Sequence, residues 1–409
     1  MALRRAFSWS AIESIGSRGF DLVALWLVMN ALPEAEIALF GVATAAIFLF
    51  NLLFIAPETS LLRYQKQWQD EGVLPSCLGA FVGFNTIKLL IHVLGLVGVA
   101  LSEGVNGVFY AILFSLTTQL LQMAEIARIY HRMDMQQSFV AKLEIASKLA
   151  WMIACSSVFY CRTAAWYFAI YTTWAFLFSI IWIGVLYRKT HFFFTLRGMI
   201  RTVYETVKGF SLWSHLAGVV TLFLYNANVL FLQWFGNVEI ADIALMTSVN
   251  KTANLFFVIP MFIQGFVPVM LANTNNQAGG MREVLLGNGA ISALQLASFL
   301  LAGSLLGQYF GVASDNLAEY YGLGVWVCCG IFVLNVTRPI STFLMMKAPP
   351  WRVFVFIFLP VSVVAIFAFG YGAFKYQALG VVVASCAIYC LLAFMLCINL
   401  ILFRTSKRR

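Results

Sequence analysis

The 409-residue sequence has very little charge: Asp, Glu, Lys and Arg make up 11% of it, against roughly 25% in a soluble domain. Hydrophobic residues make up 62% of the chain. A water-soluble fold cannot cover its surface with so few charged side chains. The composition therefore excludes a soluble protein and indicates an integral membrane protein.

Motifs for metal, nucleotide or nucleophilic chemistry are also missing. The four histidines form no HExxH-like pair, and the eight cysteines show neither zinc spacing nor an extracellular disulfide framework. The sequence contains no P-loop and no GxSxG element. We therefore expect no metal, no cofactor and no enzymatic activity.

The N-terminal segment lacks the uninterrupted apolar core of a cleavable signal, because Glu13, Arg18 and Asp21 fall within it. What the chain has in quantity is apolar runs of about 20 residues, the length that crosses a bilayer. We expect twelve spans, at residues 8–31, 36–62, 74–101, 104–127, 138–161, 163–187, 210–235, 240–271, 284–308, 317–346, 351–374 and 376–403.

The net charge of +9 is distributed unevenly over the expected loops. With the N-terminus inside, eighteen of the 26 basic residues fall on the inner side, while the outer loops receive only Arg162 and Lys375. Basic residues concentrate on the cytoplasmic side of membrane proteins. The basic excess is thus a topology signal rather than a nucleic-acid footprint, and it predicts that both termini are cytoplasmic.

A short phrase occurs twice in the chain, at an offset of 203 residues. Residues 51–57 resemble residues 254–260, and the same offset carries Thr44 onto Thr247 and Asn85 onto Asn288. With six spans in each half, both copies have the same orientation in the membrane, which is a parallel repeat. We expect an all-α polytopic protein with two six-helix lobes around a central cavity.

The expected domains are an N-terminal lobe at residues 1–187, a cytoplasmic connection at 188–209 and a C-terminal lobe at 210–409 with a short basic tail. The connection alternates bases with apolar residues. That pattern suits a helix lying in the membrane interface, although a plain tether with snorkelling bases fits it equally.

The first span carries one polar stripe that includes Glu13, Arg18 and Asp21. Each charge inside a span costs about 2.5–3.5 kcal/mol on insertion scales, so this stripe must face protein or water. Two interpretations fit: the residues line a cavity, or Arg18 and Asp21 form a structural ion pair. Glu13, Asp21 and Glu144 are the candidate coupling acids if transport is driven by protons.

Other spans repeat this pattern. Thr44, Asn51 and Glu58 share one face of span two at seven-residue spacing, and Glu144 precedes Lys148 by four residues in span five. The polar residues predicted to face the cavity are Asn51, Asn85, His215, Asn250 and Asn254.

Four cations are expected to line the cavity and bind substrate: Arg18, Lys88, Lys148 and Lys251. Lys88 and Lys251 lie near mid-span with no acid on their own helices. An anionic substrate, such as a phosphate or pyrophosphate, would supply the missing counter-charge. The alternative is that each pairs across helices with Glu13, Glu58 or Glu125.

The opening of the chain resembles a known family. The residues that carry the resemblance are Phe7-Ser8-Trp9-Ser10, Ile15-Gly16-Ser17, Phe20 and Leu39-Phe40-Gly41. They resemble the polysaccharide transporter branch of the multidrug/oligosaccharidyl-lipid/polysaccharide (MOP) exporter superfamily, which holds the Wzx-type O-antigen flippases. Leu32-Pro33 stands where the family usually has Ser-Pro, and the chain lacks two spans that the related lipid II flippases have.

The resemblance implies a flippase of the bacterial cytoplasmic (inner) membrane that moves undecaprenyl-pyrophosphate-linked oligosaccharides by alternating access. Such proteins serve O-antigen, capsule or exopolysaccharide synthesis, which suggests a glycan polymerase and a chain-length regulator as partners, and no nucleic acid. A drug/cation antiporter of the same fold is the main alternative, although a cation exporter would favour buried acids. A membrane-embedded glycan polymerase fits less well, because the outer loops are short and acidic.

Overall fold

The computed structural model describes residues 2–193, 196–256, 267 and 277–406. Every regular element in these ranges is helical. A backbone that crosses lipid has to satisfy its hydrogen bonds internally, and helices do this within one segment. The expected all-α polytopic fold is confirmed.

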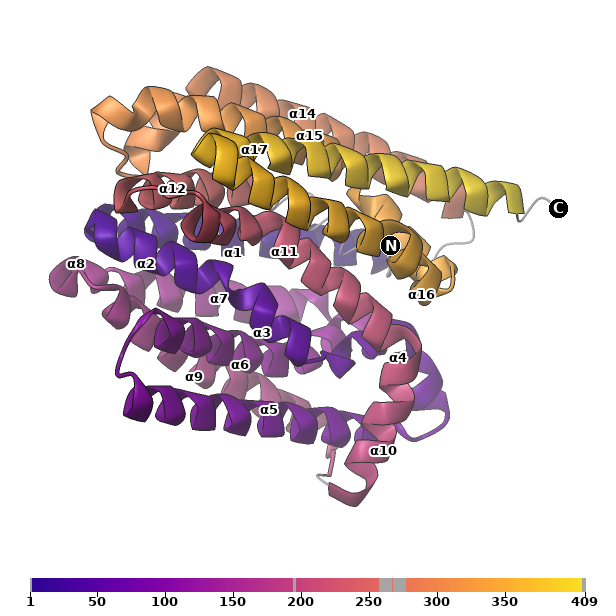
Figure 1. Cartoon of the computed structure of the whole chain (residues 1–409). Helices are drawn as coiled ribbons and strands as arrows, with labels where there is room; N and C mark the ends of the chain where they lie inside the picture. The colour runs from indigo at the N-terminus through magenta and orange to yellow at the C-terminus, as the bar shows by residue number, and fades with distance from the viewer. Residues whose placement is uncertain (1, 194–195, 257–266, 268–276, 407–409) are drawn as a thin grey trace. The chain divides into compact units, whose positions relative to one another are not determined.

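The helices follow the predicted spans closely (Figure 1). Those of the first half are α1 (Ala2–Ala31), α2 (Glu34–Ala45), α3 (Ile47–Leu53), η1 (Pro57–Ser60), α4 (Leu61–Asp70), α5 (Leu74–Ser102), α6 (Gly107–Met133), α7 (Gln137–Cys155), α8 (Val158–Cys161) and α9 (Ala164–Thr190). Those that follow are α10 (Leu196–Thr206), the π-turn η2 (Val207–Ser211), α11 (Leu212–Phe235), α12 (Ile240–Phe256), α14 (Gln277–Tyr309), η3 (Ser314–Asn316), α15 (Leu317–Lys347), α16 (Pro350–Val353), the π-turn η4 (Phe354–Phe358) and α17 (Leu359–Ser406).

Eight helical stretches are long and apolar enough to cross a membrane. The last of them, Pro350–Phe403, contains two predicted spans, because the backbone turns at Gln377 with a φ of 51°. Helices α1 and α7 have spanning length, but charged residues lower their hydropathy, and α12 reaches the edge of the described residues. In the described residues these elements match the predicted spans, while 257–266 and 268–271 of the eighth span lie outside them.

Local signals in the sequence explain several helix ends. The Asn106 side chain accepts a hydrogen bond from the Phe109 amide at 3.0 Å, and Thr163 accepts one from the Trp166 amide at 3.3 Å. These side chains satisfy amide groups at the first turns of α6 and α9. At its other end α9 stops at His191, which has a φ of 47°.

The second predicted span is not one helix, which corrects the expectation for Glu58. Helix α3 ends at Leu53, and Pro57 begins a separate 3₁₀ turn that contains Glu58. Glu58 therefore does not continue the helical face of Thr44 and Asn51. Pro57 breaks the span as predicted, since proline lacks the amide that a helix needs.

The other prolines inside the predicted spans differ in their effect on the helices. The π-turn η4 ends just before Pro360, so the chain accommodates that proline by widening the preceding turn. Pro339 lies inside the continuous helix α15. Pro260 and Pro268 lie outside the described residues.

The predicted connection between the halves contains the short helix α10. It packs against α5, and just before it the chain crosses α5 at Gly79, where an added Cβ would lie 1.9 Å from the Phe193 carbonyl oxygen. Gly209, at the end of the connection, has non-helical dihedrals, so α10 and α11 meet at a kink.

The described chain separates into two compact units. Unit 1 comprises Met1–Ala24 and Ala46–Val219, and unit 2 comprises Leu25–Ala45 and Val220–Arg409. In unit 1, α6 packs against both α5 and α9; in unit 2, α2 packs against α12, and α15 packs against α14 and α17. Each unit therefore contains segments from both sequence halves, and the predicted domain limits stay a prediction.

Several matched positions of the repeat share a structural setting. Asn85 on α5 and Asn288 on α14 are both fully buried. Thr44 and Thr247 are buried on the packed helices α2 and α12. The agreement supports the duplication at these positions.

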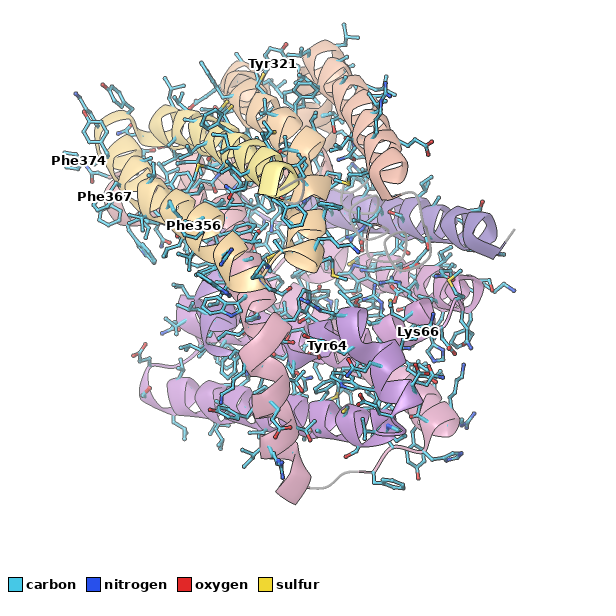
Figure 2. All side chains as sticks on the ribbon, turned by 90° about the vertical axis from the view of Figure 1, so that its right-hand side faces the viewer. Tyr64, Lys66, Tyr321, Phe356, Phe367 and Phe374 are labelled. Carbon is cyan, nitrogen blue, oxygen red and sulfur yellow. The ribbon has the colours of Figure 1, made fainter. Side chains whose placement is uncertain are left out.

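Large apolar side chains lie on the outside of the helices. Phe356, Phe367 and Phe374 of unit 2 point outward, each more than half exposed (Figure 2). Exposed aromatic side chains of this size are unfavourable in water and suit contact with lipid. The chain is thus a multi-pass membrane protein.

Candidate substrate-binding site

Lys88 occupies a neutral pocket in unit 1. Its Nζ donates to the Ile55 carbonyl oxygen at 3.0 Å and to Gln122 Oε1 at 3.1 Å. The side chain is 2% exposed and lies 5.6 Å from the centre of the Phe84 ring. Among the described residues no carboxylate forms an ion pair with the ammonium group within 4 Å, although Glu58 lies close enough to attract it electrostatically.

Residues around Lys88 are held in place by hydrogen bonds. Asn85, which was expected to face a cavity, is fully buried and donates to Glu58 Oε2 at 3.4 Å. His92 contacts the Lys88 carbonyl oxygen through Nδ1 at 2.8 Å and Ser115 Oγ through Nε2 at 2.7 Å. A carbonyl oxygen only accepts, so Nδ1 carries a proton and the imidazole is fixed in orientation.

Two of the expected cavity residues meet beside this pocket. His215 Nε2 lies 2.6 Å from the Asn51 carbonyl oxygen, and the Asn51 side chain accepts from Gln119 at 3.4 Å. Both Asn51 and His215 are buried. Asn51 therefore connects His215 and Gln119 in the polar interior of unit 1.

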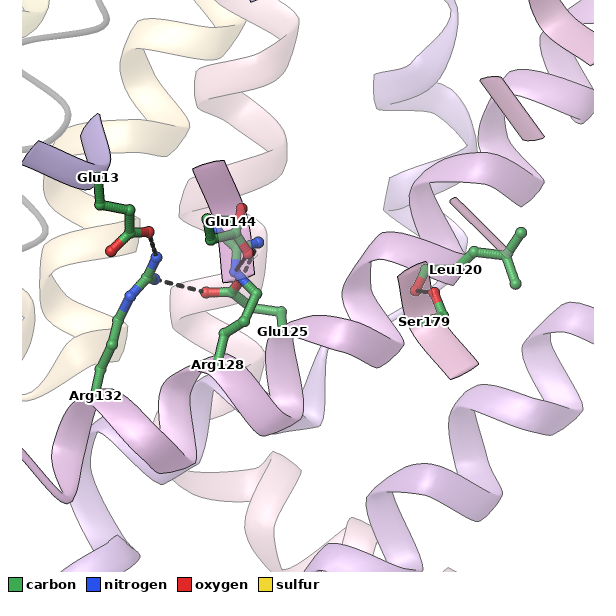
Figure 3. Close-up of polar contacts among 7 residues, drawn as sticks. All are labelled: Glu13, Leu120, Glu125, Arg128, Arg132, Glu144 and Ser179. Atoms are coloured by element: carbon green, nitrogen blue, oxygen red, sulfur yellow. Dashed lines mark hydrogen bonds and ion pairs between the residues drawn. The ribbon is translucent and has the colours of Figure 1, made fainter. Parts of the chain in front are cut away.

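A second group of charges in unit 1 is fully paired. Arg128 contacts Glu125 and Glu144, at 2.7 Å in both cases, and the Glu144 contact is a close ion pair without hydrogen-bond alignment. Arg132 donates to Glu13 and lies 3.5 Å from Glu125 (Figure 3). We call these five residues the α1–α6–α7 ion network.

Beside this network, Asp21 joins two of the predicted cations. Lys148 donates to Asp21 Oδ1 at 2.8 Å, and Arg18 donates to Oδ2 at 3.3 Å. Glu144 precedes Lys148 by four residues but does not pair with it, because Glu144 contacts Arg128 on α6. Lys148 also lies 4.8 Å from the Trp174 ring centre.

Lys251 is the counterpart of Lys88 in unit 2. Its Nζ donates to Thr44 Oγ1 at 2.9 Å and lies 4.4 Å from the Phe40 ring centre. In the described part of the chain it, too, has no carboxylate within 4 Å. Gly41 permits this geometry, since a Cβ there would lie 1.9 Å from Thr247 Oγ1 and would separate α2 from α12.

The remaining predicted cavity residues of unit 2, Asn250 and Asn254, differ in burial and in hydrogen bonding. Asn250 and Asn228 exchange two side-chain hydrogen bonds, at 2.8 and 2.6 Å, so both amides are satisfied by each other. Asn254 is half-buried at the end of the described part of α12. The structure thus places Asn250 in a structural pair rather than on an open wall.

Sequence reasoning missed two sets of buried charges. Arg128 and Arg132 were assigned to the inner loop, yet α6 extends to Met133 and carries both into the ion network. Arg338 was not singled out, although it is 7% exposed and its guanidinium lies 5.5 Å from the Tyr225 ring centre. An arginine beside proline inside a predicted span was the available signal for it.

The described charges are thus of two kinds, the first confined to unit 1 and the second found once in each unit. The α1–α6–α7 ion network holds three acids and two bases and the Asp21 group two bases and one acid, so the two groups together balance their charges, whereas Lys88 and Lys251 donate to neutral oxygens and lie near ring faces. An entering anion replaces such neutral partners without first breaking an ion pair. The assignment of these residues to an anionic substrate stays a prediction.

No protein-family model and no curated protein matches the chain. Solved structures do. A crystal structure of MATE in complex with MaL6 has 12% identity and a TM-score of 0.70, covering 100% of this chain and 97% of that one. The lipid II flippase MurJ, in an inward closed conformation, has 13% identity and a TM-score of 0.67, covering 95% and 87%.

A MOP superfamily transporter from Pyrococcus furiosus is similar too, with 13% identity and a TM-score of 0.68 over 100% of this chain and 96% of that one. Identities this low establish a shared architecture. The described chain accordingly has the all-helical membrane fold of these MATE and MurJ structures.

Proposed function

We propose that this protein is a flippase that moves undecaprenyl-pyrophosphate-linked oligosaccharide repeat units across the bacterial cytoplasmic membrane by alternating access. The observation that carries the proposal is the pair Lys88 and Lys251, cations within membrane-spanning helices that have neutral partners. A pyrophosphate is a strong acceptor for such donors. The fold shared with a lipid II flippase supports a lipid-linked cargo.

The proposal includes the setting of the protein. Both termini lie in the cytoplasm of a multi-pass inner-membrane protein, as the distribution of basic residues favours. The exported units feed surface polysaccharide synthesis, such as O-antigen, capsule or exopolysaccharide. A glycan polymerase and a chain-length regulator would then be its partners, and the protein itself transports without chemical conversion of the cargo.

A drug/cation antiporter is the second candidate, and a specific observation favours it. Glu58 is 2% exposed and accepts a hydrogen bond from the neutral side-chain amide of Asn85. No basic side chain of the described chain forms an ion pair with it within 4 Å. A buried acid of this kind suits a cationic ligand or a proton. MATE structures also share the fold. The two lysines, however, would repel a cation.

Deletion of the gene in its native bacterium tests the proposal. Lipid-linked sugars would be extracted and analysed by mass spectrometry, alongside the glycan on the cell surface. We expect an undecaprenyl-pyrophosphate oligosaccharide to accumulate and the surface polymer to disappear. An unchanged lipid pool, combined with altered sensitivity to cationic drugs, would instead identify the antiporter.

A further inference from the structure

An apolar groove lies along three helices of unit 1. It has a volume of about 420 Å³ and is lined by Leu89, Leu120, Met123, Phe176, Ser179, Ile180, Ile183, Gly184, Tyr187 and Phe192. Helix α6 forms its floor, because α5 and α9 both pack on α6 and barely contact each other in the described chain. Phe176, Ile180 and Tyr187 on α9 are about half exposed, so the groove opens to the membrane.

Two features keep this groove open and apolar. The hydroxyl of Ser179 donates to the Leu120 carbonyl oxygen at 2.5 Å and also reaches the Ala175 carbonyl oxygen, so the groove contains no unsatisfied hydroxyl (Figure 3). Gly184 contributes no side chain to the lining, and a Cβ added at this position would meet nothing within 4 Å. A hydrocarbon chain fits such a surface, whereas a polar ligand would find no donor or acceptor.

Packing alone cannot select one lipid over another. Bilayer tails are as apolar as the groove, so filling it adds van der Waals contact rather than hydrophobic transfer. Selection has to come from the headgroup. Arg188 follows Gly184 by four residues and therefore shares its side of α9. It is exposed and has no hydrogen bond or ion pair in the described chain, whereas its neighbour Lys189 binds Asp134 at 2.7 Å.

We propose that the groove on α5, α6 and α9 binds an anionic phospholipid, with one acyl chain along Gly184 and the phosphate at Arg188. Phe192 and Tyr187, whose rings meet edge to face at 5.6 Å, close the groove at the end nearest this arginine. The acyl chain thus enters from the membrane side while the headgroup stays at the interface. This lipid site is separate from the residues assigned to the cargo.

The test uses the full chain purified in detergent. Phosphatidylglycerol is expected to raise Tm by ~3 °C more than phosphatidylcholine does, and native mass spectrometry should detect the bound lipid. Gly184→Leu fills the groove and should abolish both effects. The matched control is Gly98→Leu on α5, where a Cβ also meets nothing within 4 Å but which lies outside the groove lining; it should behave like the wild type.

Arg188→Gln separates headgroup recognition from chain binding. It should remove the preference for phosphatidylglycerol while leaving phosphatidylcholine binding as in the wild type. Equal stabilisation by both lipids in the wild type, or full phosphatidylglycerol binding by Gly184→Leu, would overturn the proposal. So would stabilisation by undecaprenyl phosphate alone, since the groove would then hold the cargo carrier's tail.

Discussion

At the scale of single residues, the partner of a buried charge separates structural from functional candidates. Arg128 has two carboxylates, so its charge is balanced inside the protein. Lys88 has a carbonyl and an amide oxygen instead. Intramembrane charges are expensive, and one that is left without a counter-ion needs a reason to be retained. Under the proposed function, a visiting anion is that reason for Lys88 and Lys251.

Lys88→Ala and Lys251→Ala are therefore expected to lower transport about tenfold or more each, the loss of one hydrogen bond to a charged group. Protein in the membrane should stay near wild-type amounts, because no ion pair is broken. Surface polymer restored in the deletion strain, normalised to expressed protein, is the measurement. The control is Lys142→Ala, which removes an exposed cation on α7. Full activity in either test variant at equal expression would remove that lysine from the site.

At the scale of elements, the α1–α6–α7 ion network holds three helices of unit 1 together. Arg128 and Glu144 have side chains 22% and 4% exposed, whereas the Arg18 side chain is 47% exposed. Removing one partner of a buried pair costs about 3–5 kcal/mol, while an exposed pair contributes about 0–1 kcal/mol. The network should therefore dominate the stability of this helix group.

We expect Arg128→Met to lower the thermal unfolding temperature in detergent markedly and Arg18→Met to change it little. Arg128→Met leaves a buried carboxylate at Glu144 without its nearest cation. The double variant Arg128→Met with Glu144→Leu should recover part of the loss, because it removes that uncompensated charge. Unfolding temperatures that fall equally in the Arg128 and Arg18 variants would show that the network does not stabilise the helices.

The crossing of α2 and α12 gives a second prediction for elements. Gly41→Ala should destabilise the protein by about 1–3 kcal/mol, because its Cβ would overlap Thr247 Oγ1 and force the helices apart. Lys251 would then lose Thr44, so transport should fall as well. Adding Thr247→Ala makes room and should restore unfolding temperature and activity together. Gly19→Ala, with nothing within 4 Å, is the neutral control.

The span limits followed from hydropathy because lipid imposes one length on every crossing helix. The pairing of side chains did not, since it depends on which helices become neighbours. Glu144 and Lys148 share a helix at a favourable spacing, yet each finds its partner on another helix. Glu58 was misplaced for a local reason: the helix stops at Leu53, before Pro57. Arg128 and Arg132 were missed because the last two turns of α6 looked like loop.

At the scale of the whole chain, the sequence halves and the compact units do not coincide. Residues 25–45 belong to the unit that contains the second half, and residues 196–219 belong to the unit that contains the first. Ser211 illustrates this, since it donates to the Pro57 carbonyl oxygen at 3.1 Å. A duplicated sequence therefore does not require each copy to form its own compact body, and span parity rather than unit membership determines the orientation of the termini.

The predicted orientation is testable within unit 1, which has exposed residues in loops expected on opposite sides. Cys161 is exposed at the end of α8, on the expected outer side, and Lys66 is exposed on α4, on the expected inner side. In spheroplasts, a membrane-impermeant maleimide should label Cys161, and the signal should vanish in Cys161→Ala. In that background Lys66→Cys should react only after permeabilisation. Labelling of Lys66→Cys from outside would show that the topology is inverted and that both termini lie outside. The basic excess would then lie on the outer side, against the rule from which the orientation was inferred.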